Sequence, residues 1–243
     1  MTFNQKVVVI TGASHGIGLG IAKAFINEGA TVFSIDKDSY DGDLPIHTFV
    51  GDIASRYDRE LFIENVLTQY NHIDVLVHNA IESSHGILSP IDLDQFERIL
   101  NIGITAPYHL ISICKKYMPS GSSMINIVST RAFQSQKNTE AYSSAKGGLN
   151  SLTHALANSL APNIRVNAIA PGWIDTHDSE LSLEDKSQHL TNSVGNVEDI
   201  AEAVLFLSSS KAKFITAETI IIDGGMSKRM IYHNDEGWMY KPE

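Results

Sequence analysis

Cysteine is nearly absent from this sequence of 243 residues, in which Cys114 stands alone. A single cysteine excludes an intrachain disulfide and a multi-cysteine metal site, and it suits a reducing compartment such as the cytoplasm. The ten histidines include no HExxH or other metal-ligand spacing. We therefore expect a cytoplasmic protein without a catalytic metal, in which Cys114 is a buried small hydrophobic residue.

Basic clusters and long apolar runs are also missing. The chain has 18 Lys and Arg residues against 28 Asp and Glu residues, which gives a formal net charge of -10. A surface of that sign repels nucleic-acid phosphates and anionic membranes, so neither is an expected partner. The first apolar run, Val7–Ile10, is too short for a signal peptide or a membrane span.

Apolar runs alternate with helical patterns along the whole chain. Hydrophobic residues make up 43% of the sequence and charged residues 19%, a globular composition. The alternation predicts parallel strands covered by helices on both faces, so the expected fold is α/β, a Rossmann-like, doubly wound sheet of seven mainly parallel strands. No linker or composition shift divides the chain, and we predict one dinucleotide-binding domain over residues 1–243, with 226–243 as its C-terminal tail.

The individual elements follow from the apolar spacing. The predicted strands are Lys6–Thr11, Thr31–Asp36, His47–Gly51, Ile73–His78, Met124–Ser129, Arg165–Ala170 and Thr219–Ile222. The predicted helices are Gly16–Glu28, Arg56–Tyr70, Leu93–Tyr117, Ala141–Ala161 and Val197–Leu207. Two stretches are expected to be irregular, namely Pro171–Gly195 and the tail after Gly225.

A glycine-rich turn follows the first predicted strand. It reads Thr11-Gly12-Ala13-Ser14-His15-Gly16-Ile17-Gly18, and a helical pattern opens within it. Glycines remove the Cβ atoms that would keep backbone N–H groups away from a pyrophosphate. An ordinary strand-to-helix turn is the alternative for this motif alone, but its place at the first βα connection favours dinucleotide binding.

Asp36 ends the second predicted strand, about twenty residues after the glycine turn, where a carboxylate can bind both hydroxyls of the adenosine ribose. The same carboxylate repels a 2′-phosphate, which favours NAD over NADP. Lys37 could screen a phosphate and a protonated His15 could reach one, so NADP is not excluded. The alternative for Asp36 is a solvated carboxylate at a strand end.

Tyr142 and Lys146 stand four residues apart in a helical pattern, so their side chains share one helix face. A free tyrosine has a pKa of about 10, and a neighbouring cation lowers the pKa by stabilising the phenolate. The pair is therefore a candidate general acid or base. On its own the spacing is common, and the alternative is an exposed tyrosine beside a solvated lysine.

Two further polar residues stand at positions that suit a site. Ser129 closes the predicted strand Met124–Ser129 at its carboxyl end, where open parallel sheets bind ligands. Its hydroxyl can hold a substrate oxygen. Asn101 interrupts a helical pattern, where an amide can bond to backbone or water freed by a local distortion, although a polar residue on a helix surface is the alternative.

Together these residues resemble the short-chain dehydrogenase/reductase family, in its short single-domain branch with TGxxxGxG and YxxxK motifs. The resemblance covers nearly the whole chain. The matching motifs are the Thr11–Gly18 turn, Asp52-Ile53, Asn79-Ala80, Asn101, Ser129 with Tyr142 and Lys146, Pro171-Gly172 and Asp223-Gly224-Gly225. Three positions depart from the family pattern: Ile81 replaces a common glycine, Thr130 a frequent serine, and Asn192-Ser193 a stretch that usually contains arginine.

The resemblance implies a division of labour between the catalytic residues. Tyr142 would exchange a proton with a substrate oxygen held by Ser129, while a hydride moves to or from C4 of the nicotinamide. Lys146 would bind the nicotinamide ribose and tune the pKa of Tyr142, and Asn101 would hold a water that links Lys146 to solvent. The implied reaction interconverts a secondary alcohol and a ketone, with a polyol, sugar or hydroxy-acid derivative as the substrate.

The resemblance also implies a cofactor site for NAD. Asp52 and Ile53 would flank the adenine, and the Pro171–Thr176 segment would fix the carboxamide. The residues expected to bind the dinucleotide are Gly12, Ser14, His15, Gly16, Ile17, Gly18, Asp36, Asp52, Ile53, Asn79, Ala80, Tyr142, Lys146, Pro171, Gly172, Ile174 and Thr176. The nearest alternative function is an NADP(H)-dependent carbonyl or 3-oxoacyl reductase. A dinucleotide-sensing protein without turnover is a different class, against which the catalytic residues argue.

Two segments are expected to shape the substrate side. The loop Trp173–Leu190 should fold over the cleft, and its acidity argues mildly against an anionic substrate, unless its charges are only solvated. The tail Met226–Glu243 is rich in aromatic residues for a free terminus. Because family members are commonly tetramers, we expect a homotetramer or homodimer in which the tail packs at a subunit interface and closes a neighbour's cleft.

Overall fold

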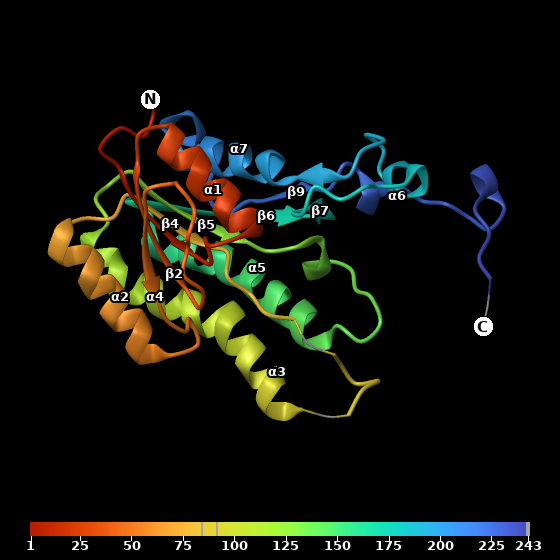
Figure 1. Cartoon of the computed structure of the whole chain (residues 1–243), viewed down its shortest axis with the longest axis horizontal. Helices are drawn as coiled ribbons and strands as arrows, with labels where there is room; N and C mark the ends of the chain where they lie inside the picture. The colour runs from red at the N-terminus through yellow and green to blue at the C-terminus, as the bar shows by residue number, and fades with distance from the viewer. Residues whose placement is uncertain (84, 91, 242–243) are drawn as a thin grey trace.

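A seven-stranded parallel sheet forms the centre of the computed structural model, which describes residues 1–83, 85–90 and 92–241 (Figure 1). The strand order is β3-β2-β1-β4-β5-β6-β9, and every neighbouring pair runs parallel. The strands are β1 (Val7–Thr11), β2 (Thr31–Asp36), β3 (Ile46–Val50), β4 (Val75–His78), β5 (Ser122–Ile127), β6 (Ile164–Pro171) and β9 (Thr219–Ile222). This order reverses direction between β1 and β4 and confirms the predicted doubly wound fold.

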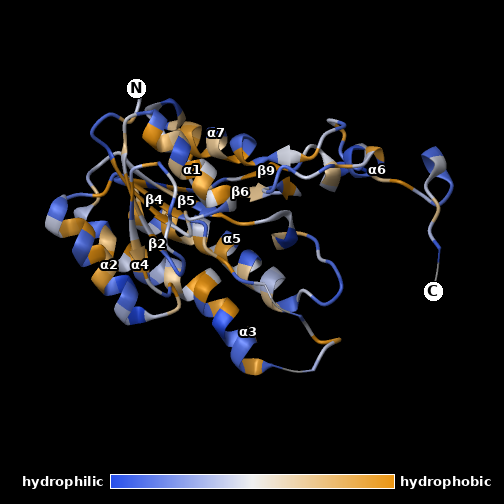
Figure 2. Cartoon of the chain, in the orientation of Figure 1, coloured by the Kyte–Doolittle hydropathy of each residue, from blue (hydrophilic) through white to orange (hydrophobic). Residues whose placement is uncertain are grey.

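Helices cover both faces of the sheet. Figure 1 shows α1 (Gly16–Asn27) and α7 (Val197–Ser208) on one side, and α2 (Arg56–Gln69), α4 (Ala106–Cys114) and α5 (Glu140–Leu160) on the other. Because side chains alternate along a strand, β1 contributes Val7 and Val9 to one apolar core and Val8 and Ile10 to the other. The central strands β1 and β4 are buried along their whole length, which explains why they read as mainly apolar runs. Figure 2 shows the same arrangement, with hydrophobic colour along the central strands.

The predicted helix Leu93–Tyr117 is interrupted. It consists of α3 (Leu93–Leu100), a π-helical turn at Asn101–Thr105, α4 and a 3₁₀ turn at Lys115–Tyr117. Within the π turn the N–H of Ala106 bonds to the carbonyl of Asn101, five residues earlier. Pro107 follows directly, and since proline has no N–H to donate, the regular helical ladder is already broken there. The distortion expected at Asn101 is confirmed, while an uninterrupted helix is wrong.

The stretch Pro171–Gly195 is more regular than predicted. A short strand β7 (Ile174–Asp175) pairs in parallel with β8 (Gly195–Asn196), and α6 (Leu183–Ser187) lies between them in sequence. The first turn of α6 is closed by a capping box, in which Ser182 and Asp185 each bind the other's backbone N–H. The prediction of an irregular stretch was therefore wrong for these three elements.

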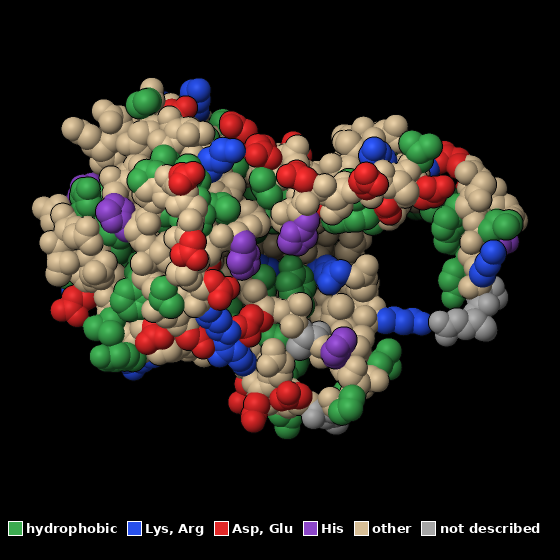
Figure 3. Space-filling view, viewed as in Figure 1, with side chains coloured by type: hydrophobic (Ala, Val, Ile, Leu, Met, Phe, Trp, Pro, Cys, Tyr) green, Lys and Arg blue, Asp and Glu red, His purple; other side chains and the backbone are tan. Residues whose placement is uncertain are grey.

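The C-terminal segment stands away from the sheet. In Figure 1 it runs out past α6, and Figure 3 shows it as a thin arm with open space between it and the body. Its large apolar side chains Met230, Tyr232, Trp238, Met239 and Tyr240 are all exposed. A local turn orders the segment, since the N–H of Asn234 donates to the carbonyl of Trp238 at 2.8 Å.

Cys114 is fully buried on α4, and burial raises the pKa of its thiol to about 12. The expectation of a buried, unreactive cysteine is confirmed. Among the helices of the described residues, none has the length and apolar character that crossing a membrane requires.

Candidate active site

A cleft of about 360 Å³ opens at the carboxyl ends of β1, β2, β3 and β4. The sequence predicted nine of its lining residues, namely Gly12, His15, Gly16, Ile17, Asp36, Ile53, Asn79, Ala80 and Thr176. Lys37, named only as a screen for a phosphate, and Ile81, named only as a departure from the family pattern, also line the cleft. Its other lining residues, Ile35, Asp38, Gly51, Glu82 and Ile102, were not predicted. These five carry no motif, and only the folded chain brings them to the edge of the sheet.

The glycine turn has a shape that only glycine permits. Gly12 and Gly16 have positive φ angles of 72° and 56°, the left-handed region that L side chains rarely adopt. A Cβ on Gly18 would lie 1.9 Å from the carbonyl oxygen of Gly12. The turn therefore leaves backbone N–H groups at the start of α1 open to a phosphate, and the residues present fit a dinucleotide.

Asn79 ties the ends of β1 and β4 together. Its side-chain amide donates to the carbonyls of Thr11 at 3.1 Å and Gly12 at 2.7 Å. In return, the hydroxyl of Thr11 accepts bonds from the N–H groups of Asn79 and Ala80, both at 3.0 Å. Asn79 was predicted to bind the cofactor; the contacts seen here give it a structural role, which shapes the cleft from beneath.

Asp36 lines the cleft at the carboxyl end of β2. Its carboxylate accepts a bond from the N–H of Ser14 at 2.9 Å, which anchors β2 to the glycine turn. Ligand-type atoms of His15, Asp36 and Asp38 lie within 4.8 Å of one another. The position suits recognition of ribose hydroxyls, and the acidic pair makes this end unfavourable to a phosphate. The expected absence of a catalytic metal stays a prediction.

Some predicted cofactor residues lie outside the cleft lining. Asp52 lies in a neighbouring recess with Arg98, and so does Asn101, which was predicted as a catalytic residue. The lining of the cleft also does not include Ser14, Gly18, Tyr142 and Lys146. Pro171 and Gly172 end β6, where a Cβ on Gly172 would lie 2.6 Å from the Cβ of Asp223. Ile174 belongs to β7, and it packs on the core that includes α1. Thr176 closes toward the cleft, with its methyl group facing Gly16.

The candidate catalytic residues come from two segments. Ser129 follows β5 and caps a 3₁₀ turn at Thr130–Ala132, accepting a bond from the N–H of Arg131 at 3.2 Å. Tyr142 and Lys146 lie in α5, which packs against that turn. The ammonium of Lys146 is 5.7 Å from the centre of the Tyr142 ring. Ser129, Tyr142 and Lys146 thus meet, as the family resemblance implied, although β5 itself ends two residues before Ser129.

Burial dominates the electrostatics of this group. It raises the pKa of the Tyr142 phenol, while the Ser129 hydroxyl and the positive charge of Arg131 lower it. The guanidinium carbon of Arg131 lies 5.6 Å from the centre of the Tyr142 ring. The expected effect of Lys146 on this pKa stays a prediction, because the cation that acts on the phenol here is Arg131.

Lys146 is only 2% exposed, and its ammonium donates to the carbonyl of Ile127 at 2.7 Å. Burial lowers its pKa to about 7. A lysine of that pKa exchanges protons readily near neutral pH. Since an ammonium has three donors, the bond to Ile127 leaves two for a ligand.

Asn101 points toward the loop that follows β3. Its side-chain amide donates to the carbonyl of Ala54 at 2.9 Å, in the loop after β3. The π turn that carries Asn101 packs against α5, and a Cβ on Gly103 would lie 2.7 Å from the Cβ of Ala145. Glycine at 103 thus permits this close approach. A water between Asn101 and Lys146 stays a prediction.

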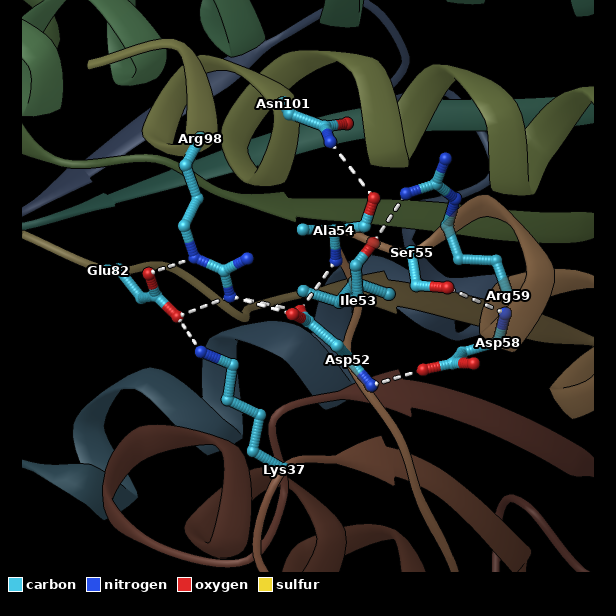
Figure 4. A network of polar contacts seen from close by, with 10 residues as sticks. All are labelled: Lys37, Asp52, Ile53, Ala54, Ser55, Asp58, Arg59, Glu82, Arg98 and Asn101. Carbon is cyan, nitrogen blue, oxygen red and sulfur yellow. Dashed lines mark hydrogen bonds and ion pairs between the residues drawn. The ribbon is translucent and has the colours of Figure 1, made fainter. Parts of the chain in front are cut away.

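A network of charged side chains borders the cleft beside Asn101 (Figure 4). Arg98 binds Glu82 through Nε at 2.9 Å and Nη2 at 3.0 Å, and Nη2 also lies 2.9 Å from Asp52. Lys37 pairs with the same Glu82 from the opposite side. Glu82 and Arg98 were not predicted as site residues, because charges that pair only after folding carry no sequence motif.

Comparisons with known proteins agree with this geometry. A family model described as "Enoyl-(Acyl carrier protein) reductase" matches residues 12–227. An uncharacterized oxidoreductase of Thermotoga maritima is 38% identical over 250 residues, covering 93% of this chain and 98% of that protein.

Solved structures show the same relationship. A "SCOR enzyme" of Clostridium thermocellum, in its apo form, superposes with a TM-score of 0.92 at 44% identity, covering 98% of this chain and 99% of that one. A blue fluorescent protein from a metagenomic library, in complex with NADPH, gives a TM-score of 0.86 at 29% identity, covering 93% and 100%.

The burial of Lys146 predicts a pH-dependent effect of Lys146→Met on stability. In the unfolded chain the pKa of this lysine is about 10.4, whereas in the fold it is about 7. Between these values the unfolded state binds the extra proton, so the wild-type free energy of unfolding rises with pH through this window. The variant lacks this dependence. It should be more stable than the wild type at pH 6 by about 1–3 kcal/mol, and the advantage should fade toward pH 10.

Urea unfolding at several pH values without added nucleotide measures this difference. Lys115→Met is the matched control, because Lys115 is exposed on the 3₁₀ turn that follows α4. This variant should show no such trend. A stability difference for Lys146→Met that is constant from pH 6 to pH 10 would contradict the prediction.

Proposed function

The chain belongs to the short-chain dehydrogenase/reductase family, and we propose that it is an NAD(H)-dependent oxidoreductase that interconverts a secondary alcohol and a ketone. One observation carries the proposal: Ser129, Tyr142 and Lys146 converge at α5, and residues of that helix pack against Ile81 in the lining of a cleft that also contains the glycine turn and Asp36. We take the substrate to be a polyol, sugar or hydroxy-acid derivative, and the cytoplasm, which suits the lone buried cysteine, to be the compartment.

The protein's own residues would handle the proton and the substrate oxygen. NAD, when bound, supplies the hydride acceptor. The Ser129 hydroxyl would donate to the substrate oxygen, and Tyr142 would take its proton during alcohol oxidation or return it during ketone reduction. The two free donors of Lys146 would hold ribose hydroxyls, and a charged Lys146 would favour the phenolate. Arg131, already close to the Tyr142 ring, acts in the same direction.

Asp36 supports NAD over NADP. Its carboxylate is held in place by the N–H of Ser14 and has room to accept from ribose hydroxyls, whereas a 2′-phosphate would meet a negative charge. An NADP(H)-linked reductase is the alternative, because one structural neighbour was solved with NADPH and Lys37 follows Asp36 directly.

Turnover should depend on the Tyr142 hydroxyl, whereas cofactor binding should not. Tyr142→Phe keeps the ring but cannot exchange a proton, so kcat should fall by about a hundredfold or more, while NADH still binds. A panel of alcohols, sugars and hydroxy acids with NAD, followed by nicotinamide absorbance, identifies the substrate for this measurement. Tyr108→Phe, which alters an exposed tyrosine on α4, is the control and should retain activity. Undiminished turnover in Tyr142→Phe would reject the assignment.

Cofactor choice should depend on Asp36. In fluorescence titrations we expect NADH to bind about tenfold more tightly than NADPH, a difference of about 1.4 kcal/mol. Asp36→Asn should reduce this preference by removing the repulsion of the 2′-phosphate. Asp43→Asn, an exposed residue of the following loop, should leave the preference unchanged. A wild-type preference for NADPH would overturn the proposed cofactor.

We also propose that residues 1–243 act as one domain in a homotetramer or homodimer, with the tail at a subunit interface. The side chains of Met230, Trp238 and Met239 support this, because each of them stays exposed to solvent in the single subunit. Deletion of residues 230–243 should therefore change the assembly seen by light scattering or raise the Michaelis constant. If both the assembly and the Michaelis constant stay unchanged, the proposal that the tail packs at an interface is contradicted.

A further inference from the structure

An ion pair spans the adenosine end of the cleft. Lys37 directly follows Asp36 at the end of β2, and Glu82 belongs to the loop after β4. Both side chains line the cleft, and they meet in a salt bridge (Figure 4). The cation nearest to Asp36 in sequence is therefore already bound to a carboxylate.

Glu82 is also bound by Arg98. The guanidinium of Arg98 donates to both carboxylate oxygens of Glu82, at 2.9 Å and 3.0 Å, and forms an ion pair with Asp52 at 2.9 Å. Such paired, charge-assisted bonds fix direction as well as distance. The bonds from Arg98 and Lys37 also lower the pKa of Glu82 to about 2, so the carboxylate stays ionised at neutral pH. Glu82 thus presents Lys37 with a stationary negative partner.

NADP differs from NAD by a phosphate at the 2′ position of the adenosine ribose. A 2′-phosphate placed beside Asp36 needs a nearby cation to offset the repulsion. Lys37 is next to Asp36 in sequence, but its ammonium is turned across the cleft to Glu82. Arg98, the next cation in the network, is committed to Glu82 and Asp52.

We propose that Glu82 is a positioning residue for cofactor selectivity, which keeps the Lys37 ammonium away from the 2′ position of the adenosine ribose. Asp36 then repels the phosphate, and Glu82 withholds the cation that would compensate. This inference rests on the proposed NAD(H) function. It differs from a purely structural role, in which loss of the ion pair would weaken both cofactors equally.

The test is the ratio of NADPH affinity to NADH affinity, measured by fluorescence titration of the full chain. Glu82→Gln keeps the side chain's size but releases Lys37, so the ratio should shift toward NADPH by about fivefold, the effect of one partly exposed ion pair. The gain should shrink with added salt. In Glu82→Gln/Lys37→Gln the gain should disappear, because the freed ammonium is its cause.

Two control variants test whether the shift is specific to the pair of Glu82 and Lys37. Glu97→Gln removes the same charge from the exposed surface of α3, one residue from Arg98, and should leave the ratio unchanged. Lys37→Gln alone should not lower NADPH affinity relative to NADH, because Lys37 is already occupied. This second variant also decides the matter if Glu82→Gln does not fold.

The proposal is overturned if Glu82→Gln leaves the ratio as in the wild type, if Glu97→Gln shifts it equally, or if the gain persists without Lys37. A selective loss of NADPH affinity in Lys37→Gln would overturn it as well. Failure of the proposed function is a separate result, since it would show as a wild-type preference for NADPH or as no nucleotide binding. The change in the ratio between variants is measured independently of turnover.

Discussion

The side chain of Asn79 holds the carboxyl ends of β1 and β4 together by donating to the carbonyls of Thr11 and Gly12. These two strands lie where the sheet order reverses, the one place in a doubly wound sheet where neighbouring loops diverge and leave a crevice. The crevice is open only because the Gly12–Gly18 turn has left-handed residues and no Cβ against Asn79. Cleft, glycine turn and α1 thus depend on one small set of bonds between two strand ends.

The reactive half depends on a different constraint, the cost of burying a lysine. Lys146 has no carboxylate partner among its described contacts and is stabilised by a single carbonyl, that of Ile127. The burial that lowers the pKa of Lys146 to about 7 also raises the pKa of Tyr142, so the two values, similar in free side chains, lie further apart in the fold. The stability that the fold loses at Lys146 leaves a buried amine that can exchange its proton near neutral pH.

The apolar runs of the buried central strands predict the sheet from the sequence. Helix spacing puts Tyr142 and Lys146 on one helix face, whereas the meeting of both with Ser129 was implied by the resemblance to the family. The helix α6 and the β7–β8 pair were not predicted, although Ser182 and Asp185 have capping-box spacing. The partnership of Lys37, Glu82 and Arg98 joins three distant segments, and a single sequence contains no record of which charges meet across a cleft.

That network also connects the two halves of the site. Arg98 and Asn101 are three residues apart at the junction of α3 and the π turn, and both hold the loop after β3 (Figure 4). Arg98 does so through Asp52, whose carboxylate also accepts from the N–H of Ala54, while Asn101 binds the carbonyl of that same Ala54. The loop that would flank the adenine is therefore bonded to the turn that packs on the helix of Tyr142 and Lys146. The candidate residues for nucleotide recognition and for proton transfer are thus joined by one chain of contacts, so a change at Glu82 or Arg98 acts on a position that is also linked to α5.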